Sequence, residues 1–310
     1  MMKESVHAKV KPFGRLLGIG QSARVIGLTV VVTLLCSSAV LCAEPAGSPL
    51  SVAWKDGFLS IRGSFPGGEV RICYLEAYCR AGSTDRDWSE TVIGHKSRLV
   101  AASPDGKFVR LLDTLDDGVL VRHTISAGKD EIDFRLEAHN PTGAASEADW
   151  AQPCMRVDRF TGRGHADARA RVPAYARQCF IFLGRKLTRL PTEPWAESAR
   201  YVPGQVYCPP GVNRADVNPR PLSRLVPSCG LVGCFSADGR QILATAWEPY
   251  QELFQGVIAC IHSDFRIGGL EPGERKRIHG KLYIVPADVD ALVVRYRRDF
   301  PEQAGGLGRP

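Results

Sequence analysis

A regular succession of turns in the middle of the chain constrains its fold more than any other feature. Three turn sequences, Pro-Asp-Gly-Lys at 104–107, Asp-Asp-Gly at 116–118 and Ala-Gly-Lys-Asp at 127–130, separate runs of apolar and β-branched residues. The runs at 119–125 and 131–138 alternate apolar with polar residues, as strands do when one face is exposed to water. Turns repeated about every dozen residues are typical of an antiparallel β-meander. The pattern therefore predicts an all-β domain.

Strand-like runs continue on both sides of this meander, and helix signals are nearly absent before the end of the chain. Further strands are expected at 58–63, 69–78, 98–102, 152–157, 178–183, 230–236, 241–247, 257–262 and 277–285. Near the end, Asp288 can cap a helix. Its apolar residues are three and four positions apart: Val289, Leu292, Val293, Tyr296 and Phe300. The sequence predicts a single β-sandwich domain over 44–301 with a short C-terminal helix, and a flexible tail over 302–310.

The amino-terminal segment has the composition of an export signal. Five basic residues precede an uncharged apolar run over 25–43: Lys3, Lys9, Lys11, Arg15 and Arg24. Residues 1–43 are therefore expected to be a signal peptide cleaved after Ala43. The alternative is an uncleaved anchor, because about 20 apolar residues can span a bilayer. In both cases the basic residues stay on the cytoplasmic side of the membrane, so the domain is expected to be exported to the periplasm or beyond. Contact with the membrane is expected only through residues 25–43.

The charge of the remaining chain argues against nucleic acid as a partner. Residues 1–43 contain five basic residues and one acidic residue, so the formal charge of +7 falls to +3 without them. The rest of the chain has no run of Lys and Arg with interleaved aromatic residues. Nucleic-acid binding normally requires such a basic patch, and we expect none here.

Cysteine use leaves three alternatives open. Eight cysteines follow residue 43: Cys73, Cys79, Cys154, Cys179, Cys208, Cys229, Cys234 and Cys260. An even number in an oxidising compartment permits disulfides. However, several lie in apolar, strand-like runs, where a free thiol packs as a small hydrophobic group. Metal ligation is the third alternative, but no two cysteines form a Cys-x-x-Cys pair, and glycine-rich phosphate loops and His-Glu-x-x-His are missing. The sequence predicts no metal and no cofactor.

Two blocks of sequence resemble the galactose-mutarotase-like β-supersandwich domains. One is the pair of strands over 117–142, which ends in Asn140-Pro141-Thr142, and the other runs from His262 to Glu274 and leads into a long terminal strand. The fuller pattern is similar to an uncharacterised family of secreted bacterial proteins. The resemblance implies a β-supersandwich and, by analogy, a carbohydrate ligand. Such domains include aldose epimerases, parts of polysaccharide lyases and glycosidases, and modules that only bind.

His262 and Asp264 are the strongest catalytic candidates. They follow an apolar strand and share one of its faces through the two-residue period. A histidine held by a carboxylate can act as general acid or base near neutral pH. We expect His262 to be the acid, with Glu76 or Asp264 as the base. The alternative is a hydrogen-bonded pair that fixes the following turn.

Residues expected to bind a substrate come mainly from the segment that begins at Trp150. Even spacing places Trp150, Gln152, Arg156 and Asp158 on one face of a strand, and a structural Arg-Asp pair is the alternative. Sugar recognition uses such a mixture of an aromatic plane with polar donors and acceptors. Two further candidates are Trp247, at a strand end, and Arg220, in the proline-rich segment 191–227.

Two functions follow from these features. The first is an exported carbohydrate-active or carbohydrate-binding protein, with acid–base chemistry at a sugar if it is an enzyme. The second is a noncatalytic structural or protein-interaction module at the cell surface. The sequence does not decide between an enzyme and a binding protein.

Overall fold

The computed structural model describes residues 49–83, 86–162, 172–195, 206–216, 222–256 and 258–307. The chain divides into two units, residues 1–44 and 45–310. The first unit, with the expected export signal, lies outside the described residues, so the fold below is that of the second. Among the described residues, no helix is long and apolar enough to cross a membrane.

The described residues form two antiparallel sheets. Sheet A has the strand order β1-β2-β3-β9-β16-β15-β12, with β4 paired to β3. Its strands are β1 (Ser51–Lys55), β2 (Phe58–Arg62), β3 (Glu69–Arg80), β4 (Val92–Ile93), β9 (Ala148–Arg156), β12 (Val206–Tyr207), β15 (Tyr250–Gln255) and β16 (Cys260–Arg266).

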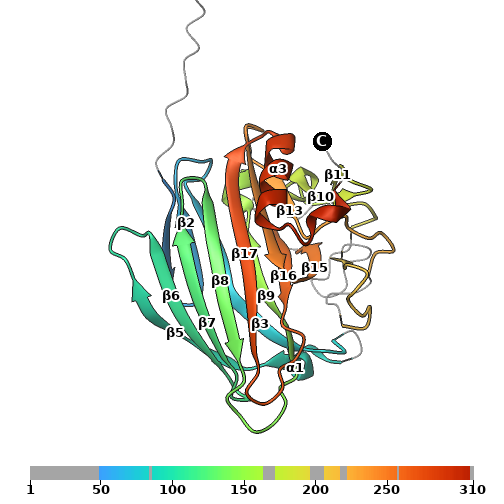
Figure 1. Ribbon diagram of the computed structural model, residues 1–310. Coiled ribbons are helices and arrows are strands. Elements are labelled where there is room, and N and C mark those ends of the chain that lie inside the picture. The colour runs from blue at the N-terminus through green and yellow to red at the C-terminus, as the bar shows by residue number, and fades with distance from the viewer. Residues whose placement is uncertain are drawn as a thin grey trace, which may run out of the picture. The chain divides into compact units, whose positions relative to one another are not determined.

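Sheet B has the order β11-β10-β13-β14-β17-β8-β7-β6-β5. Its strands are β5 (His95–Ala102), β6 (Phe108–Leu115), β7 (Leu120–Ala127), β8 (Glu131–His139), β10 (Cys179–Leu183), β11 (Lys186–Arg189), β13 (Val232–Phe235), β14 (Gln241–Glu248) and β17 (Arg275–Pro286). Figure 1 shows β5 to β8 and β17 side by side as one layer. The all-β class and the β-sandwich expected from the sequence are confirmed.

The alternation of the meander strands decides which side chains enter the space between the sheets. In β7, Val121, His123 and Ile125 are buried while the residues between them are more exposed. In β8, Phe134 and Leu136 point the same way, since β7 and β8 pair with Val121 opposite Ala138 and Ile125 opposite Phe134. These side chains pack against the inward residues of sheet A in one continuous hydrophobic core.

A polar network lies inside this core and joins the two sheets. The imidazole of His123 on β7 lies 2.9 Å from the hydroxyl of Tyr74 and 3.2 Å from that of Tyr78, both on β3. The Tyr78 hydroxyl donates to Asp113 on β6 at 2.7 Å, and Asp113 lies 3.1 Å from His123. All four side chains are buried.

The C-terminal helix is confirmed as α3 (Val289–Asp299), with the Asp288 side chain accepting a hydrogen bond from the backbone N–H of Ala291. Two short helices, α1 (Trp88–Thr91) and α2 (Asp158–Thr161), complete the larger elements. The buried face of α3 carries Leu292 and Tyr296. The expected flexible tail contacts this helix, because Arg297 donates a hydrogen bond to the carbonyl of Leu307 at 3.0 Å.

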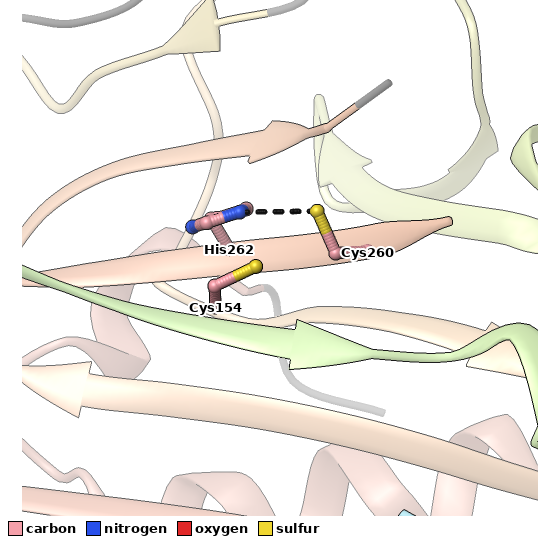
Figure 2. A group of neighbouring side chains, drawn as sticks. All are labelled: Cys154, Cys260 and His262. Atoms are coloured by element: carbon pink, nitrogen blue, oxygen red, sulfur yellow. Dashed lines mark hydrogen bonds between the residues drawn. The ribbon is translucent and has the colours of Figure 1, made fainter. Parts of the chain in front are cut away.

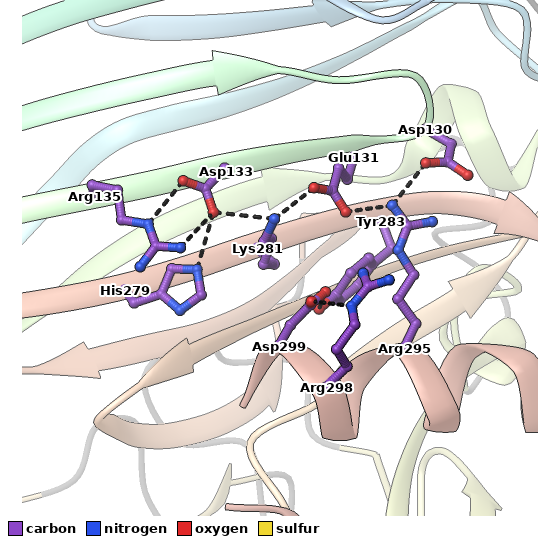
Figure 3. A network of polar contacts seen from close by, with 10 residues as sticks. All are labelled: Asp130, Glu131, Asp133, Arg135, His279, Lys281, Tyr283, Arg295, Arg298 and Asp299. Atoms are coloured by element: carbon purple, nitrogen blue, oxygen red, sulfur yellow. Dashed lines mark hydrogen bonds and ion pairs between the residues drawn. The ribbon is translucent and has the colours of Figure 1, made fainter. Parts of the chain in front are cut away.

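A chain of ion pairs fixes α3 to sheet B (Figure 3). Arg295 on α3 pairs with Asp130 at 2.7 Å and with Glu131, at the start of β8. Lys281 on β17 continues the chain by bridging Glu131 and Asp133. Asp133 also lies 3.0 Å from His279. This network fixes the helix where the apolar pattern alone would leave its position along the sheet undefined.

Candidate functional site

The outer face of sheet A, on the side away from sheet B, brings polar residues of four neighbouring strands together. In β9, β15 and β16 the inward residues Met155, Leu253 and Ile261 belong to the core, so the alternate residues point outward. The register between β9 and β16 pairs Cys260 with Arg156 and Phe265 with Ala151. The outward residues in this register are Gln152, Cys154 and Arg156 on β9 and Cys260, His262 and Asp264 on β16.

On the other side of β16, strand β15 adds Phe254 and Glu252. Phe254 pairs with His262, and Glu252 pairs with Asp264. The rings of Phe254 and His262 are stacked, with centroids 4.0 Å apart and planes inclined by 8°. Stacking on Phe254 therefore restricts the orientation of the His262 imidazole.

Two thiols and an imidazole form the centre of this face (Figure 2). The Sγ of Cys260 lies 3.3 Å from Nε2 of His262, and Cys154 lies beside them, with the three donor atoms all within 4.8 Å of one another. The three residues are between 1 and 2 % exposed. The backbone of Gly256 packs directly on this group, since a Cβ at Gly256 would lie 2.2 Å from the Sγ of Cys260. We call Cys154, Cys260 and His262 the thiol–imidazole group.

The contacts within this group shift the pKa values of its two thiols in opposite directions. A hydrogen bond from Cys154 holds the pKa of the Cys260 thiol well below its ordinary value despite burial, with a further contribution from His262. The same hydrogen bond, together with burial, raises the pKa of Cys154. Burial alone would lower the pKa of His262, but the charge of Cys260 and the contacts with Asp264 raise it.

Asp264 lies behind His262 on the same strand. Its Oδ1 is 3.5 Å from Nδ1 of His262, an ion-pair distance that is long for a hydrogen bond. Burial raises the pKa of Asp264, and the charge of Glu76 adds to this effect. Both ring nitrogens of His262 therefore face protein groups, Nδ1 toward Asp264 and Nε2 toward Cys260. The general-acid role expected for His262 stays a prediction.

A second row of polar side chains crosses the four strands next to the thiol–imidazole group. We call it the polar row: Glu76 on β3, Gln152 on β9, Asp264 on β16 and Glu252 on β15. The amide nitrogen of Gln152 donates to Glu76 at 3.2 Å. Within the described part of the chain, neither carboxylate oxygen of Asp264 has a hydrogen-bond partner, and neither has Oε1 of Gln152. Glu76 is exposed, whereas the other three side chains are buried.

Segments of the long connections cover two parts of this face. The hydroxyl of Tyr175 donates to the carbonyl of Gly256, and Gln255 donates to the carbonyl of Ala176 at 2.8 Å. These two contacts hold residues 172–178 over the thiol–imidazole group. Elsewhere, Asp216 of the proline-rich segment accepts a hydrogen bond from the backbone of Gly82 at 2.7 Å.

The structure brings most of the predicted site residues together. Glu76, Gln152, His262 and Asp264 lie on the outer face of sheet A, and half-buried Arg156 lies beside Cys260. Arg220 lies outside the described residues.

Three expectations for binding residues need correction. Trp247 lies between the sheets instead of on a face, with its ring 4.8 Å from Phe265 and 5.1 Å from Phe134, because β14 is buried on both sides. Asp158 does not continue the even spacing of β9, since that strand ends at Arg156 and Asp158 begins α2. Trp150 is on the expected face but fully covered, by a cluster that includes Trp88. The aromatic plane expected for a sugar is therefore not offered by either tryptophan.

Sequence reasoning missed four members of the site: Cys154, Cys260, Glu252 and Phe254. Their signal is weak because the three strands that carry them are buried on both faces, so no apolar–polar alternation marks the outward residues. Cys154 and Cys260 are also far apart in the sequence, and only the antiparallel register brings them together.

Another hollow lies on the outer side of sheet B. It has a volume of about 520 Å³, and its lining includes Arg122, Arg135, Arg277, Glu248 and His279. Arg135 and His279 both pair with Asp133, at 2.9 and 3.0 Å. Asp133 thus satisfies two of the lining side chains, whereas the buried Oε1 of Glu248 has no hydrogen-bond partner among the described residues.

Comparisons with known proteins find likeness only in structure. No family model matches the chain, and no curated protein matches it in sequence. Solved structures similar to it include galactose mutarotase-like proteins from Lactobacillus casei (8% identity, TM-score 0.38, 76% of this chain and 99% of that one) and Clostridium acetobutylicum (9%, 0.39, 76% and 94%). A third is a galactose 1-epimerase from Lactobacillus acidophilus (8%, 0.36, 78% and 99%). These belong to the fold group that the sequence resembles.

Proposed function

We propose that the outer face of sheet A binds a carbohydrate through the polar row. One observation carries this proposal: three buried acceptor atoms, both carboxylate oxygens of Asp264 and Oε1 of Gln152, make no hydrogen bond among the described residues, with only Nδ1 of His262 facing Oδ1 of Asp264, at 3.5 Å. A buried acceptor without a donor costs about 1–3 kcal/mol. Such atoms are nearly always satisfied by protein, water or ligand in folded proteins.

A sugar can donate the hydrogen bonds that the acceptor atoms of the polar row lack. Each hydroxyl group can donate a hydrogen bond, and adjacent hydroxyls can reach neighbouring carboxylate and amide oxygens. Glu76, at the exposed end, accepts from Gln152 and keeps further acceptor capacity. The row can therefore bind a polyhydroxyl ligand by hydrogen bonds, without the stacking plane that the sequence suggested.

Two arginines on the strands of the polar row favour an acidic sugar over a neutral one. Arg71 on β3 is exposed and pairs in the register with half-buried Arg156 on β9. A guanidinium group binds a carboxylate through two parallel hydrogen bonds. We infer that a uronate binds with its carboxylate toward these arginines and its hydroxyls toward the polar row.

The test combines a ligand screen with one exposed variant. Thermal unfolding of the purified chain is measured with neutral sugars, uronates and sulfated oligosaccharides; a ligand at a hundred times its Kd adds about 2.7 kcal/mol of stability. Calorimetric titration then measures the affinity of the best ligand for the unaltered chain, for Glu76→Gln and for Glu137→Gln, which makes the same change on sheet B. A charged hydrogen bond contributes about 1.5–3 kcal/mol, so Glu76→Gln should weaken binding by about tenfold or more while Glu137→Gln leaves it unchanged. No ligand from the panel, or equal effects of the two variants, would contradict the proposal.

We also propose that the chain is exported. The support is the basic, then apolar composition of residues 1–43. Intact-mass measurement of the chain recovered outside the cytoplasm distinguishes the two forms, one beginning at Glu44 and one retaining residues 25–43 as an anchor. Recovery of the chain only from the cytoplasm would contradict export.

A further inference from the structure

We propose that Cys154, Cys260 and His262 form a binding site for a thiophilic metal ion, zinc foremost. Their three donor atoms come from two neighbouring strands and lie within 4.8 Å of one another. Figure 2 shows the sulfur atoms and the imidazole turned toward a common point. This inference goes beyond the proposed carbohydrate binding, because its three ligand residues are not members of the polar row and a metal ion is a different ligand.

The spacing of the donors fits a tetrahedral ion. With the usual Zn–S and Zn–N bond lengths, two ligands of a tetrahedral site are about 3.6 Å apart for sulfur and nitrogen and about 3.8 Å for two sulfurs. The observed distance between Sγ of Cys260 and Nε2 of His262 is 3.3 Å. A shift of a few tenths of an ångström therefore suffices at this pair. Two thiolates and an imidazole select zinc or copper(I) over calcium or magnesium.

Asp264 occupies the position of a supporting group for a metal-bound histidine. Metal-binding histidines generally donate their second ring N–H to a carboxylate, which fixes the tautomer and turns the other nitrogen toward the metal. Here Oδ1 of Asp264 faces Nδ1 of His262 at 3.5 Å, while Nε2 faces Cys260. Stacking on Phe254 holds the ring in the same orientation.

The surroundings of the thiol–imidazole group favour a bound ion over free thiols. The group is almost fully buried, and Nε2 of His262 faces the Sγ of Cys260 at 3.3 Å. Gly256 packs against Cys260, and a side chain at that position would clash with its Sγ. Binding of the ion forms two metal–sulfur bonds and one metal–nitrogen bond, and the protons that the three ligand atoms carry are released to solvent. Three protein ligands leave one coordination position for water or a ligand oxygen.

The experiment uses the full chain, purified with a phosphine reductant and stripped of metal by a chelator. Zinc is titrated in competition with a chromophoric chelator, and cobalt(II) is added to a second sample as a spectroscopic probe. We expect one ion per chain, the visible absorption of tetrahedral cobalt(II), and a thiolate-to-cobalt charge-transfer band in the near ultraviolet. In Cys154→Ser and His262→Gln the affinity for zinc should fall at least about tenfold.

Cys208→Ser is the matched control, since Cys208 is another buried thiol outside the group. It should bind zinc like the unaltered chain. The proposal is overturned if the folded chain binds no zinc, if the cobalt spectrum lacks the thiolate band, or if the control loses affinity equally. A mass lower by two hydrogens before reduction, mapped to a bond between Cys154 and Cys260, also overturns it. The cobalt spectrum needs no variant, so the test holds even if a variant fails to fold.

Failure of this proposal is distinguishable from failure of carbohydrate binding. Sugar affinity is measured in the same metal-free and zinc-loaded samples, with Glu76→Gln as the variant that affects only the sugar. A chain that binds sugar but no zinc overturns the metal site alone.

Discussion

Asp264 holds its Oδ1 atom 3.5 Å from Nδ1 of His262, on the same face of β16. The two-residue period of a strand puts the two side chains on one face, and both are buried. The pairing expected from the sequence is therefore present, but the far side of the ring faces a cysteine.

Replacement of Asp264 by asparagine tests whether the contact between Asp264 and His262 supports zinc binding. Asparagine keeps the shape of the side chain but loses its negative charge, so it supports the imidazole less strongly. We expect Asp264→Asn to lower zinc affinity about tenfold to a hundredfold, the usual effect of losing such a supporting group. The competition titration described above measures this change, and an unaltered affinity would show that Asp264 does not support His262.

The position of Trp247 leads to a second prediction. Because the ring packs between the sheets, Trp247→Phe should lower the free energy of unfolding by about 0.5–3 kcal/mol and leave sugar affinity unchanged. Gln152→Leu removes an acceptor of the polar row and should weaken binding. Chemical denaturation and calorimetry measure the two quantities. A loss of affinity in Trp247→Phe at unchanged stability would mean that the ring contacts ligand.

Replacement by alanine should affect the free energy of unfolding very differently at two aliphatic residues of α3. Leu292 is 1 % exposed and Val294 is 55 % exposed. Leu292→Ala should destabilise the domain by about 2–5 kcal/mol, because it removes buried methyl groups and leaves a cavity. Val294→Ala should change stability by less than about 0.5 kcal/mol. Equal effects in urea denaturation would contradict the packing of α3 against sheet B.

The polar network inside the core predicts a dependence of stability on pH. Burial alone would raise the pKa of Asp113, but the charge of His123 and hydrogen bonds from His123 and Tyr78 lower it below its ordinary value. A lowered folded-state pKa stabilises the fold above the unfolded-state pKa of about 3.9. This stabilisation is lost as the pH falls through the folded-state pKa.

Asp113→Asn should therefore cost about 1–3 kcal/mol at neutral pH. The difference from the unaltered chain should shrink below about pH 4. Urea denaturation at several pH values measures it, with exposed Glu302→Gln as the control. A difference that stays constant from neutral to acidic pH would contradict the assigned charge of Asp113.

The meander and α3 could be predicted because their residues alternate or repeat with the period of the element. In β7 and β8 one face is wet, so the pattern of Val121 and Ile125 identifies both the strands and their inward side. The site has no such pattern. β9, β14, β15 and β16 are covered on both faces, so Trp150 on β9 and Trp247 on β14 looked like exposed ligand platforms when they are packed residues.

The register between strands is the second reason why the site could not be predicted from the sequence. The meeting of Cys154 with Cys260, and of Glu252 with Asp264, depends on which residues pair across antiparallel strands that are distant in sequence. A shift of one residue would turn every one of these side chains to the opposite face. No local pattern in the sequence specifies that register, so the thiol–imidazole group and the polar row become visible only in the folded chain.

The most direct measurement is a crystal structure of the chain with the sugar that gives the largest thermal shift. We predict ligand hydroxyls within hydrogen-bond distance of the carboxylate of Asp264 and the amide of Gln152, with any ligand carboxylate toward Arg71 and Arg156. Density for the sugar in the hollow of sheet B between Arg122, Glu248 and His279, with none on the outer face of sheet A, would contradict the account.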